Sequence, residues 1–118
     1  MDVFIQLDKL SRGLDRLIYR LVELSPQSVA ESIDFDSLQA CYLDDGAMGS
    51  LRFSERGQDK GDRKLGKKVA ELEFMDADGI PVSAVLFLDE AGHLFELDIF
   101  KADFSPLITI PSVLDISS

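Results

Sequence analysis

Hydrophobic residues recur at intervals of three and four in the first part of the chain. Leucine and isoleucine keep this spacing from Leu7 to Leu24, which is the pattern of one face of an amphipathic α-helix. We predict a helix of about 17 residues here, with Gly13 inside it. Ser25 should end the helix, because the residue before a proline avoids helical geometry. Pro26 could then begin a short second helical turn.

The hydrophobic period changes from about four to two after Asp36, which indicates β-strands. The expected strands span residues 38–43, 47–53, 69–75, 80–88 and 93–101. A turn at 44–46 joins the first two, and the Asp78-Gly79 pair is typical of a hairpin between the third and fourth. We predict a single α+β domain over residues 1–118, with an N-terminal amphipathic helix packed on an antiparallel β-meander of about five strands.

Two segments fall outside these elements. Residues 54–68 carry six Lys or Arg against three acids and three glycines, and we predict a mobile loop. Residues 104–111 are apolar and interrupted by prolines. This tail is expected to pack along the sheet or to add an edge strand.

Alternation assigns the side chains of the last three strands to two faces of the sheet. One face is expected to meet the helix, and its residues are Ala70, Leu72, Phe74, Val82, Ala84, Leu86, Leu88, Phe95, Leu97 and Ile99. The other face would present Glu71, Glu73, Met75, Ser83, Val85, Phe87, Glu96, Asp98 and Phe100. Two interpretations stay open for this mixed face. Either the helix and tail cover part of it, or its apolar residues are anchors for a partner that the acids attract.

Composition adds a strong charge asymmetry. The 118 residues carry a net charge of −10, and hydrophobic residues make up 46% of them, which is enough for a packed core. Residues 1–25 are balanced, residues 54–68 carry +3, and the remainder carries 15 acids against only Arg52 and Lys101. This acidic part would repel nucleic acids and anionic membranes and would attract a basic partner. The acidity is also explained by solubility alone.

Few residues offer catalytic or metal-binding chemistry. His93 is the single histidine and lies beside a turn glycine, and Cys41 is the single cysteine and fits a small buried hydrophobe. Residues 76–79 superficially resemble a calcium loop, but Phe74 and Val85 would then occupy its first and twelfth positions, where neither can bind the ion as required. We therefore expect no cofactor and no metal. The chain shows no signal peptide pattern and no apolar run of membrane-spanning length, so we expect a cytoplasmic protein.

Two cations in the acidic part suggest ion pairs. Lys101 and Asp103 are expected to pair and to fix the turn that follows them. Arg52 could serve the same purpose against Asp98 or Asp103.

Two stretches carry a resemblance to a known family. They are Asp-Gly-Ala-Met-Gly-Ser-Leu-Arg-Phe at residues 45–53 and Glu-Leu-Asp-Ile-Phe-Lys-Ala-Asp-Phe-Ser-Pro-Leu at residues 96–107. Over roughly residues 42–111 the chain resembles a family of small bacterial domains of unknown function. In size and acidity such domains resemble immunity proteins, which protect a cell from the toxins of contact-dependent competition. The resemblance brings no catalytic residues with it.

The sequence thus favours a non-enzymatic binding protein of the immunity type. It would neutralise a basic toxin C-terminal domain through an acidic sheet face, without nucleic acid or membrane as partner. The candidate partner-binding residues are Asp44, Asp45, Glu71, Glu73, Phe87, Glu96, Asp98 and Phe100. Two alternatives remain: an enzyme with a carboxylate site, and a scaffold protein that associates with itself, so the oligomeric state stays open.

Overall fold

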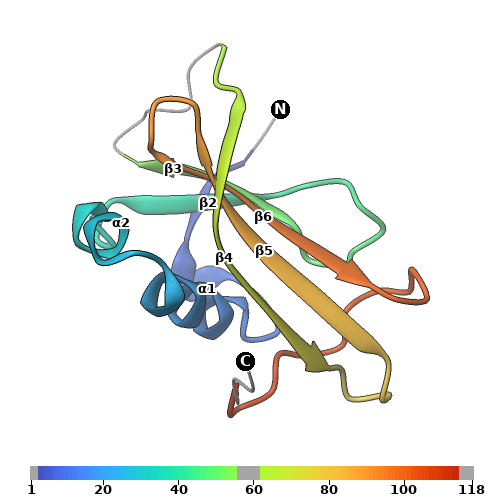
Figure 1. Cartoon of the computed structure of the whole chain (residues 1–118). Helices are drawn as coiled ribbons and strands as arrows, with labels where there is room; N and C mark the ends of the chain where they lie inside the picture. The colour runs from blue at the N-terminus through green and yellow to red at the C-terminus, as the bar shows by residue number, and fades with distance from the viewer. Residues whose placement is uncertain (1–2, 56–61, 115–118) are drawn as a thin grey trace.

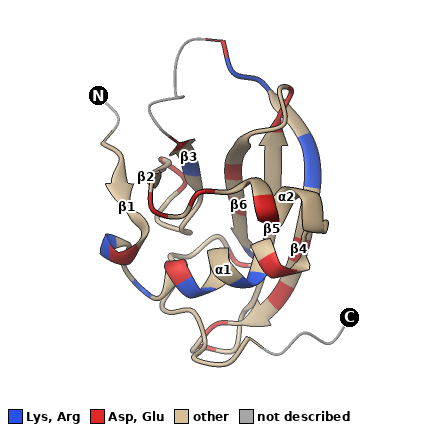
Figure 2. Cartoon of the chain, turned by 90° about the vertical axis from the view of Figure 1, so that its left-hand side faces the viewer, with Lys and Arg blue, Asp and Glu red and all other residues tan. Residues whose placement is uncertain are grey.

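The fold is one antiparallel sheet with two α-helices on one of its faces (Figures 1 and 2). The computed structural model describes residues 3–55 and 62–114. Within these residues the strands are β1 (Ile5–Gln6), β2 (Leu38–Tyr42), β3 (Leu51–Glu55), β4 (Leu65–Met75), β5 (Pro81–Asp89) and β6 (Leu94–Lys101). The helices are the 3-10 turn η1 (Leu7–Lys9), α1 (Leu14–Leu24) and α2 (Gln27–Ser32). The α+β class is confirmed.

The sheet is not the expected five-strand meander. Its order is β1-β2-β3-β6-β5-β4, so β3 lies beside β6 and not beside the strand that follows it in sequence. β4, β5 and β6 do form a meander, close to the three predicted ranges. β1 was not predicted, because two residues are too short to show an alternating pattern.

The predicted 17-residue helix is wrong at its N-terminal end. The backbone of Arg12 and Gly13 is left-handed, with φ of 61° and 81°, and Gly13 is the N-cap of α1. Because consecutive left-handed residues interrupt an α-helix, the leucine stripe is divided between η1 and the 11-residue α1. Both pieces still direct their leucines into one core, so the spacing alone could not reveal the break. The end at Ser25 and the second turn after Pro26 are confirmed.

The first hairpin is also wider than expected. β3 begins at Leu51 and not at residue 47, because residues 43–50 form a loop closed by Asp45. The carboxylate of Asp45 accepts hydrogen bonds from the backbone N–H groups of Met48 and Ser50, at 3.1 and 3.0 Å. Such side-chain bonds compete with strand pairing.

The basic segment is only partly a loop. Ser54 belongs to β3, and residues 65–68 belong to β4. Arg63 is held by hydrogen bonds to Phe53 O and Leu94 O, each at 2.7 Å, and by an ion pair with Asp89. The prediction of a loop is therefore wrong for residues 54–55 and 65–68, and residues 56–61 lie outside the described residues.

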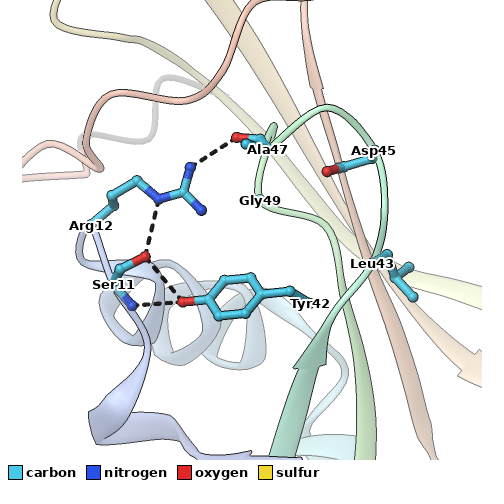
Figure 3. A pocket seen from close by; sticks show the side chains of 7 residues that line it. All are labelled: Ser11, Arg12, Tyr42, Leu43, Asp45, Ala47 and Gly49. Carbon is cyan, nitrogen blue, oxygen red and sulfur yellow. Dashed lines mark hydrogen bonds between the residues drawn. The ribbon is translucent and has the colours of Figure 1, made fainter. Parts of the chain in front are cut away.

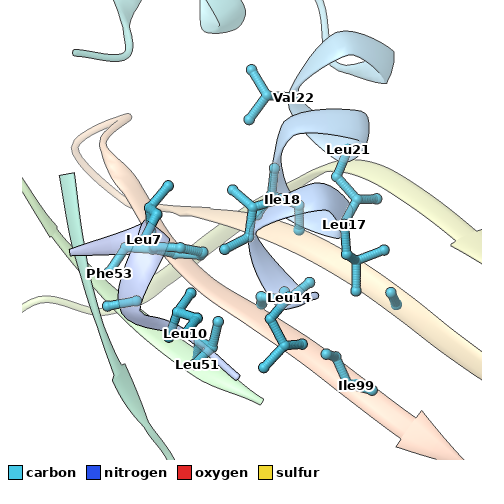
Figure 4. Packing of buried hydrophobic residues seen from close by; sticks show 14 of the residues in the cluster. Leu7, Leu10, Leu14, Leu17, Ile18, Leu21, Val22, Leu51, Phe53 and Ile99 are labelled. Atoms are coloured by element: carbon cyan, nitrogen blue, oxygen red, sulfur yellow. The ribbon is translucent and has the colours of Figure 1, made fainter. Parts of the chain in front are cut away.

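The core lies between α1 and the inner face of the sheet (Figure 4). Leu14, Leu17, Ile18 and Leu21 of α1 are completely buried. They belong to one hydrophobic cluster with the predicted inner-face residues of β4, β5 and β6, except Phe95. Phe95 occupies an irregularity in the β5–β6 register, and the guanidinium groups of Arg52 and Arg63 lie over its ring at 5.0 and 4.9 Å from the centroid.

The tail packs but forms no strand in its described part. Leu107 and Ile110 are buried in the core. The N–H of Leu107 donates to Ala47 O, and the N–H of Ile110 donates to Arg12 O, at 3.0 and 2.8 Å. The tail thus joins the loop 43–50 to the segment that precedes α1.

Candidate functional site

The face of the sheet opposite the helices brings together six of the eight predicted site residues. The strand register aligns Glu71 with Val85 and Asp98, and aligns Glu73 with Ser83 and Phe100. Phe87 stands beside Glu96 in the next row. We call this surface the outer face. It is made of Glu71, Glu73, Met75, Ser83, Val85, Phe87, Glu96, Asp98 and Phe100. The helices lie on the opposite side, so they do not form a second core layer here (Figure 2).

The acids of the outer face do not converge. Neighbouring strands lie about 4.8 Å apart, so Glu71 and Asp98 are separated by about 10 Å, with Val85 between them. A hollow of about 180 Å³ on this surface, next to Phe100, includes Glu73 as its single acid. The register therefore spreads the four acids over three rows and two strands, β4 and β6.

Glu96 is the exception among these acids because it is half-buried, whereas the other ion pair of this face, Lys68 with Glu71, is exposed. It lies 3.8 Å from Arg52, which replaces the predicted pairing of Arg52 with Asp98 or Asp103. Burial raises the pKa of Glu96, and repulsion from Asp98 adds to this, while the attraction of Arg52 opposes it. Arg52 holds Glu96 in place and also lies over Phe95.

One end of the outer face is apolar and exposed. Phe100 and Phe104 meet edge to face, with ring centroids 5.1 Å apart. Their exposed fractions are 45% and 69%, and Met75, on the same face of the sheet but across β5, is 58% exposed. We call these three residues the aromatic end. Phe104 was not among the predicted site residues, because it lies after the last strand in a segment expected to pack.

The backbone holds Phe104 out in solvent. Its φ is 64°, a conformation that costs a non-glycine residue roughly 1–2 kcal/mol. The N–H of Phe104 donates to Lys101 O, and the carboxylate of Asp103 accepts hydrogen bonds from the N–H and hydroxyl groups of Ser105. The chain therefore spends conformational energy to expose a ring, as occurs at binding sites.

Asp44 and Asp45 do not belong to the outer face, because they lie between β2 and β3 and pair with none of its strands. Both belong to the loop 43–50, outside the strand rows that align the other six. Asp45 is used to close its own loop, and Asp44 is exposed beside it. The structure therefore divides the predicted site into a sheet group and a loop group.

A buried ion pair supports the aromatic end from beneath. Lys101 is 1% exposed and donates to Asp76 and Asp78, each at 2.8 Å, and to Pro106 O at 3.1 Å. The predicted partner, Asp103, is wrong, because the ammonium group of Lys101 is buried between Asp76 and Asp78, and it reaches the following turn only through Pro106 O. The carboxylate of Asp76 also accepts the N–H groups of Ile108 and Thr109. Asp76 thus connects β6, the β4–β5 turn and the tail.

These hydrogen bonds set the charge of Asp76. Burial by itself would raise its pKa, but the bonds from Lys101 and from the backbone of Ile108, Thr109 and Ala77 outweigh this and lower the pKa from 3.8 to about 2. A carboxylate with a lowered folded pKa contributes stability above its unfolded pKa, and that contribution is lost as the pH falls through the folded pKa.

We therefore expect acid to destabilise the protein by about 2 kcal/mol through Asp76 alone, between about pH 4 and pH 2. Urea unfolding curves recorded across this range measure the loss. Asp76→Asn should flatten that part of the profile, since it removes the titrating group. A variant with the same slope as the unmodified protein would show that another carboxylate is responsible.

A separate pocket of about 470 Å³ opens between the start of α1 and the loop 43–50 (Figure 3). It is lined by Ser11, Arg12, Tyr42, Leu43, Asp45, Ala47 and Gly49. The Tyr42 hydroxyl group accepts a hydrogen bond from Ser11 N–H at 2.8 Å and lies 3.0 Å from Ser11 Oγ. Arg12 donates through Nη1 to Ala47 O and through Nε to Ser11 Oγ. This pocket has no local signal in the sequence, because the fold of the loop brings its residues together.

The single cysteine and the single histidine lie outside the outer face and outside this pocket. Cys41 is buried, and the His93 side chain is about half exposed at 3.9 Å from Asp89. Over residues 3–55 and 62–114, no group of three or more metal-ligating side chains gathers. In the same residues no helix is long and apolar enough to cross a membrane.

Comparison with known proteins gives one match. The model of a family described as a domain of unknown function (DUF6984) matches residues 8–111. No curated protein and no solved structure matches the chain.

Proposed function

We propose that this chain, which belongs to the DUF6984 family of domains of unknown function, is a binding protein whose outer face captures a basic protein partner. The aromatic end carries the proposal: Phe100 and Phe104 meet edge to face and are both exposed, and Met75 is exposed on the same face of the sheet, which the helices leave open. Large aromatic side chains dominate the binding energy of protein interfaces when a partner covers them. Here the protein holds one of them in a strained backbone conformation.

The acids of the outer face complement these anchors. Glu71, Glu73 and Asp98 are exposed, and Glu73 also lines the hollow next to Phe100. Exposed charges near an interface mainly raise the association rate and reject partners of the same charge. With a net charge of −10, the chain would favour a basic surface.

The most specific form of the proposal is an immunity-type protein that acts in the cytoplasm. It would bind a basic toxin domain from a contact-dependent competition system and cover its active site or an accessory surface. This form rests on the small size and the acidity of the chain together with the resemblance described above. The product of the gene immediately upstream is the partner to test first.

We expect Phe104→Ala and Phe100→Ala each to weaken binding of that upstream product by about 30-fold or more, the effect of losing about 2 kcal/mol from an aromatic anchor. Biolayer interferometry gives both rate constants. Tyr19→Ala is the matched control, since Tyr19 is 44% exposed on α1 and pairs with Phe35. Equal losses for Tyr19→Ala would place the interface on the helices.

Charge reversal tests the acids separately. We expect Glu71→Lys combined with Asp98→Lys to slow association and to flatten its dependence on salt, while dissociation changes little. Glu23→Lys on α1 should leave both rate constants nearly unchanged. Association that is insensitive to salt in the unmodified protein would contradict steering by the outer face.

The alternatives give different results. A scaffold that associates with itself would sediment as a homodimer, and Phe104→Ala would convert it to a monomer. An enzyme with a carboxylate site would lose turnover when Glu71 or Asp98 is replaced by its amide, although Val85 separates these two acids in their row across the sheet.

A further inference from the structure

The pocket between α1 and the loop 43–50 is a built cavity that the proposed interface does not use. Its volume of about 470 Å³ falls in the range of small-molecule sites. Its walls come from two segments that lie about 30 residues apart in sequence, Ser11-Arg12 and residues 42–49. Leu43, Ala47 and Gly49 supply an apolar surface, and the polar groups stand at its sides (Figure 3).

Arg12 supplies the positive group of the pocket. Nη1 donates to Ala47 O at 2.8 Å and to Leu107 O at 3.1 Å, and Nε donates to Ser11 Oγ. These bonds fix the guanidinium group and leave Nη2, which faces the open space in Figure 3, for a ligand. A fixed guanidinium group is well suited to bind a carboxylate.

Asp45 supplies the negative group among the residues that line the pocket, and in Figure 3 its side chain lies within the curve of the loop 43–50. Its two oxygens each accept one backbone N–H, from Met48 and Ser50. A carboxylate has about four lone-pair positions, so each oxygen can accept a further hydrogen bond. The same contacts that orient Asp45 therefore leave it able to bind an ammonium group.

The backbone around the pocket is strained on both sides. Arg12 and Ala47 are two of the three non-glycine residues with positive φ in residues 3–55 and 62–114, at 61° and 63°. They are joined directly by the hydrogen bond from Nη1 to Ala47 O. Strain that the surrounding contacts maintain is characteristic of ligand sites.

We propose that this pocket binds a small zwitterion, with its carboxylate on Arg12 and its ammonium group on Asp45. One cation and one anion across an apolar surface match a ligand of zero net charge with opposite charges at its ends. A simple carboxylate would face Asp45 without a counter-ion, and a simple amine would face Arg12 in the same way. Tyr42 and Ser11 offer hydroxyl groups at the side of the site.

The test uses the chain of 118 residues and a series of amino acids in which the two charges move apart: glycine, β-alanine, γ-aminobutyrate and ε-aminocaproate. Heteronuclear NMR titration shows which backbone amide signals of the protein shift. The length of the amino-acid ligand that binds best indicates the distance between Arg12 and Asp45. We expect shifts centred on residues 11–12 and 42–49. Caproate and hexylamine, which each carry one of the two charges, should bind at least about 10-fold more weakly than the zwitterion of equal length.

Variants assign the two ends of the ligand. Arg12→Gln should weaken zwitterion binding by at least about 10-fold and abolish the preference for a ligand with a carboxylate. Asp45→Asn should abolish the preference for a ligand with an ammonium group, and its amide oxygen can still accept one loop N–H. Asp44→Asn and Arg20→Gln are the matched controls, because they remove the same charges outside the pocket and should bind as the unmodified protein does.

The preferences remain readable if a variant is less stable, since each is a ratio of two affinities measured on the same folded sample. Equal binding of caproate and ε-aminocaproate would overturn the proposal. Shifts outside the pocket residues would overturn it as well. So would the absence of a saturable shift with any zwitterion at about 10 mM, because a specific site should have a Kd of about 1 mM or lower. The result is independent of the Phe104→Ala experiment, because the pocket shares no residue with the outer face.

Discussion

Replacing Lys101 by methionine is expected to destabilise the folded protein by about 3–5 kcal/mol, a large part of the stability of a domain of this size. The ammonium group is 1% exposed and bonds to two carboxylates and one carbonyl. Its removal would leave the buried charge of Asp76 without its cation. Urea unfolding measures the change in the free energy of unfolding.

The double replacement separates the pair from its surroundings. Asp76→Asn with Lys101→Met should be less destabilised than the sum of the single variants, since no uncompensated charge remains. Lys68→Met is the control, because Lys68 and Glu71 form an exposed pair that should contribute less than about 1 kcal/mol. Additive effects of the two single changes would show that Lys101 and Asp76 act independently. Hydrogen exchange at Ile108 and Thr109 should accelerate in Lys101→Met, because Asp76 binds both amides.

Arg63→Ala is expected to cost about 3–5 kcal/mol in the free energy of unfolding. The Arg63 side chain is 10% exposed and bonds to the Phe53 and Leu94 carbonyl groups and to Asp89, and it lies over the Phe95 ring. The change would leave buried acceptors in β3 and β6 without their donor, and it would open one side of Phe95.

Lys64→Ala is the matched control for Arg63, since it removes a neighbouring cation whose side chain is exposed. Thermal unfolding of both variants should show a large decrease in Tm for Arg63→Ala and almost none for Lys64→Ala. Similar values for the two would mean that the basic segment stabilises the fold through its overall charge.

Much of the fold follows from local patterns. Alternation in β4, β5 and β6 identified their strands and faces, because a period of two leaves little freedom once one face is buried. The helix was overextended because leucines before and after Gly13 point into the same core, and the break depends on backbone angles that spacing does not encode. The β3–β6 pairing is a long-range contact between strands separated by a hairpin, and no local signal predicts it.

The outer face was foreseeable for the same reason as the strands. Its six predicted residues share a face because of register alone. The exposure of Phe104 could not be foreseen, because it depends on the left-handed backbone of Phe104 after β6. The pocket could not be foreseen either, because it depends on a loop that Asp45 closes. The lone lysine of the last strand was recognised as structural but was given the wrong acid, because Asp76 approaches Lys101 only when β4, β5 and β6 are aligned.

The position of β4 at the end of the sheet has a consequence for solubility. Its outward edge is a template that a second copy of the chain could extend into an aggregate. Register shifts on both sides of Lys68 make the first half of β4 irregular. The second half of β4 carries Glu71 and Glu73 on one face. If two copies paired antiparallel along this edge with Glu71 of one copy opposite Glu73 of the other, like charges would face each other, which is unfavourable. The charges proposed to recruit a basic protein therefore also keep identical chains apart.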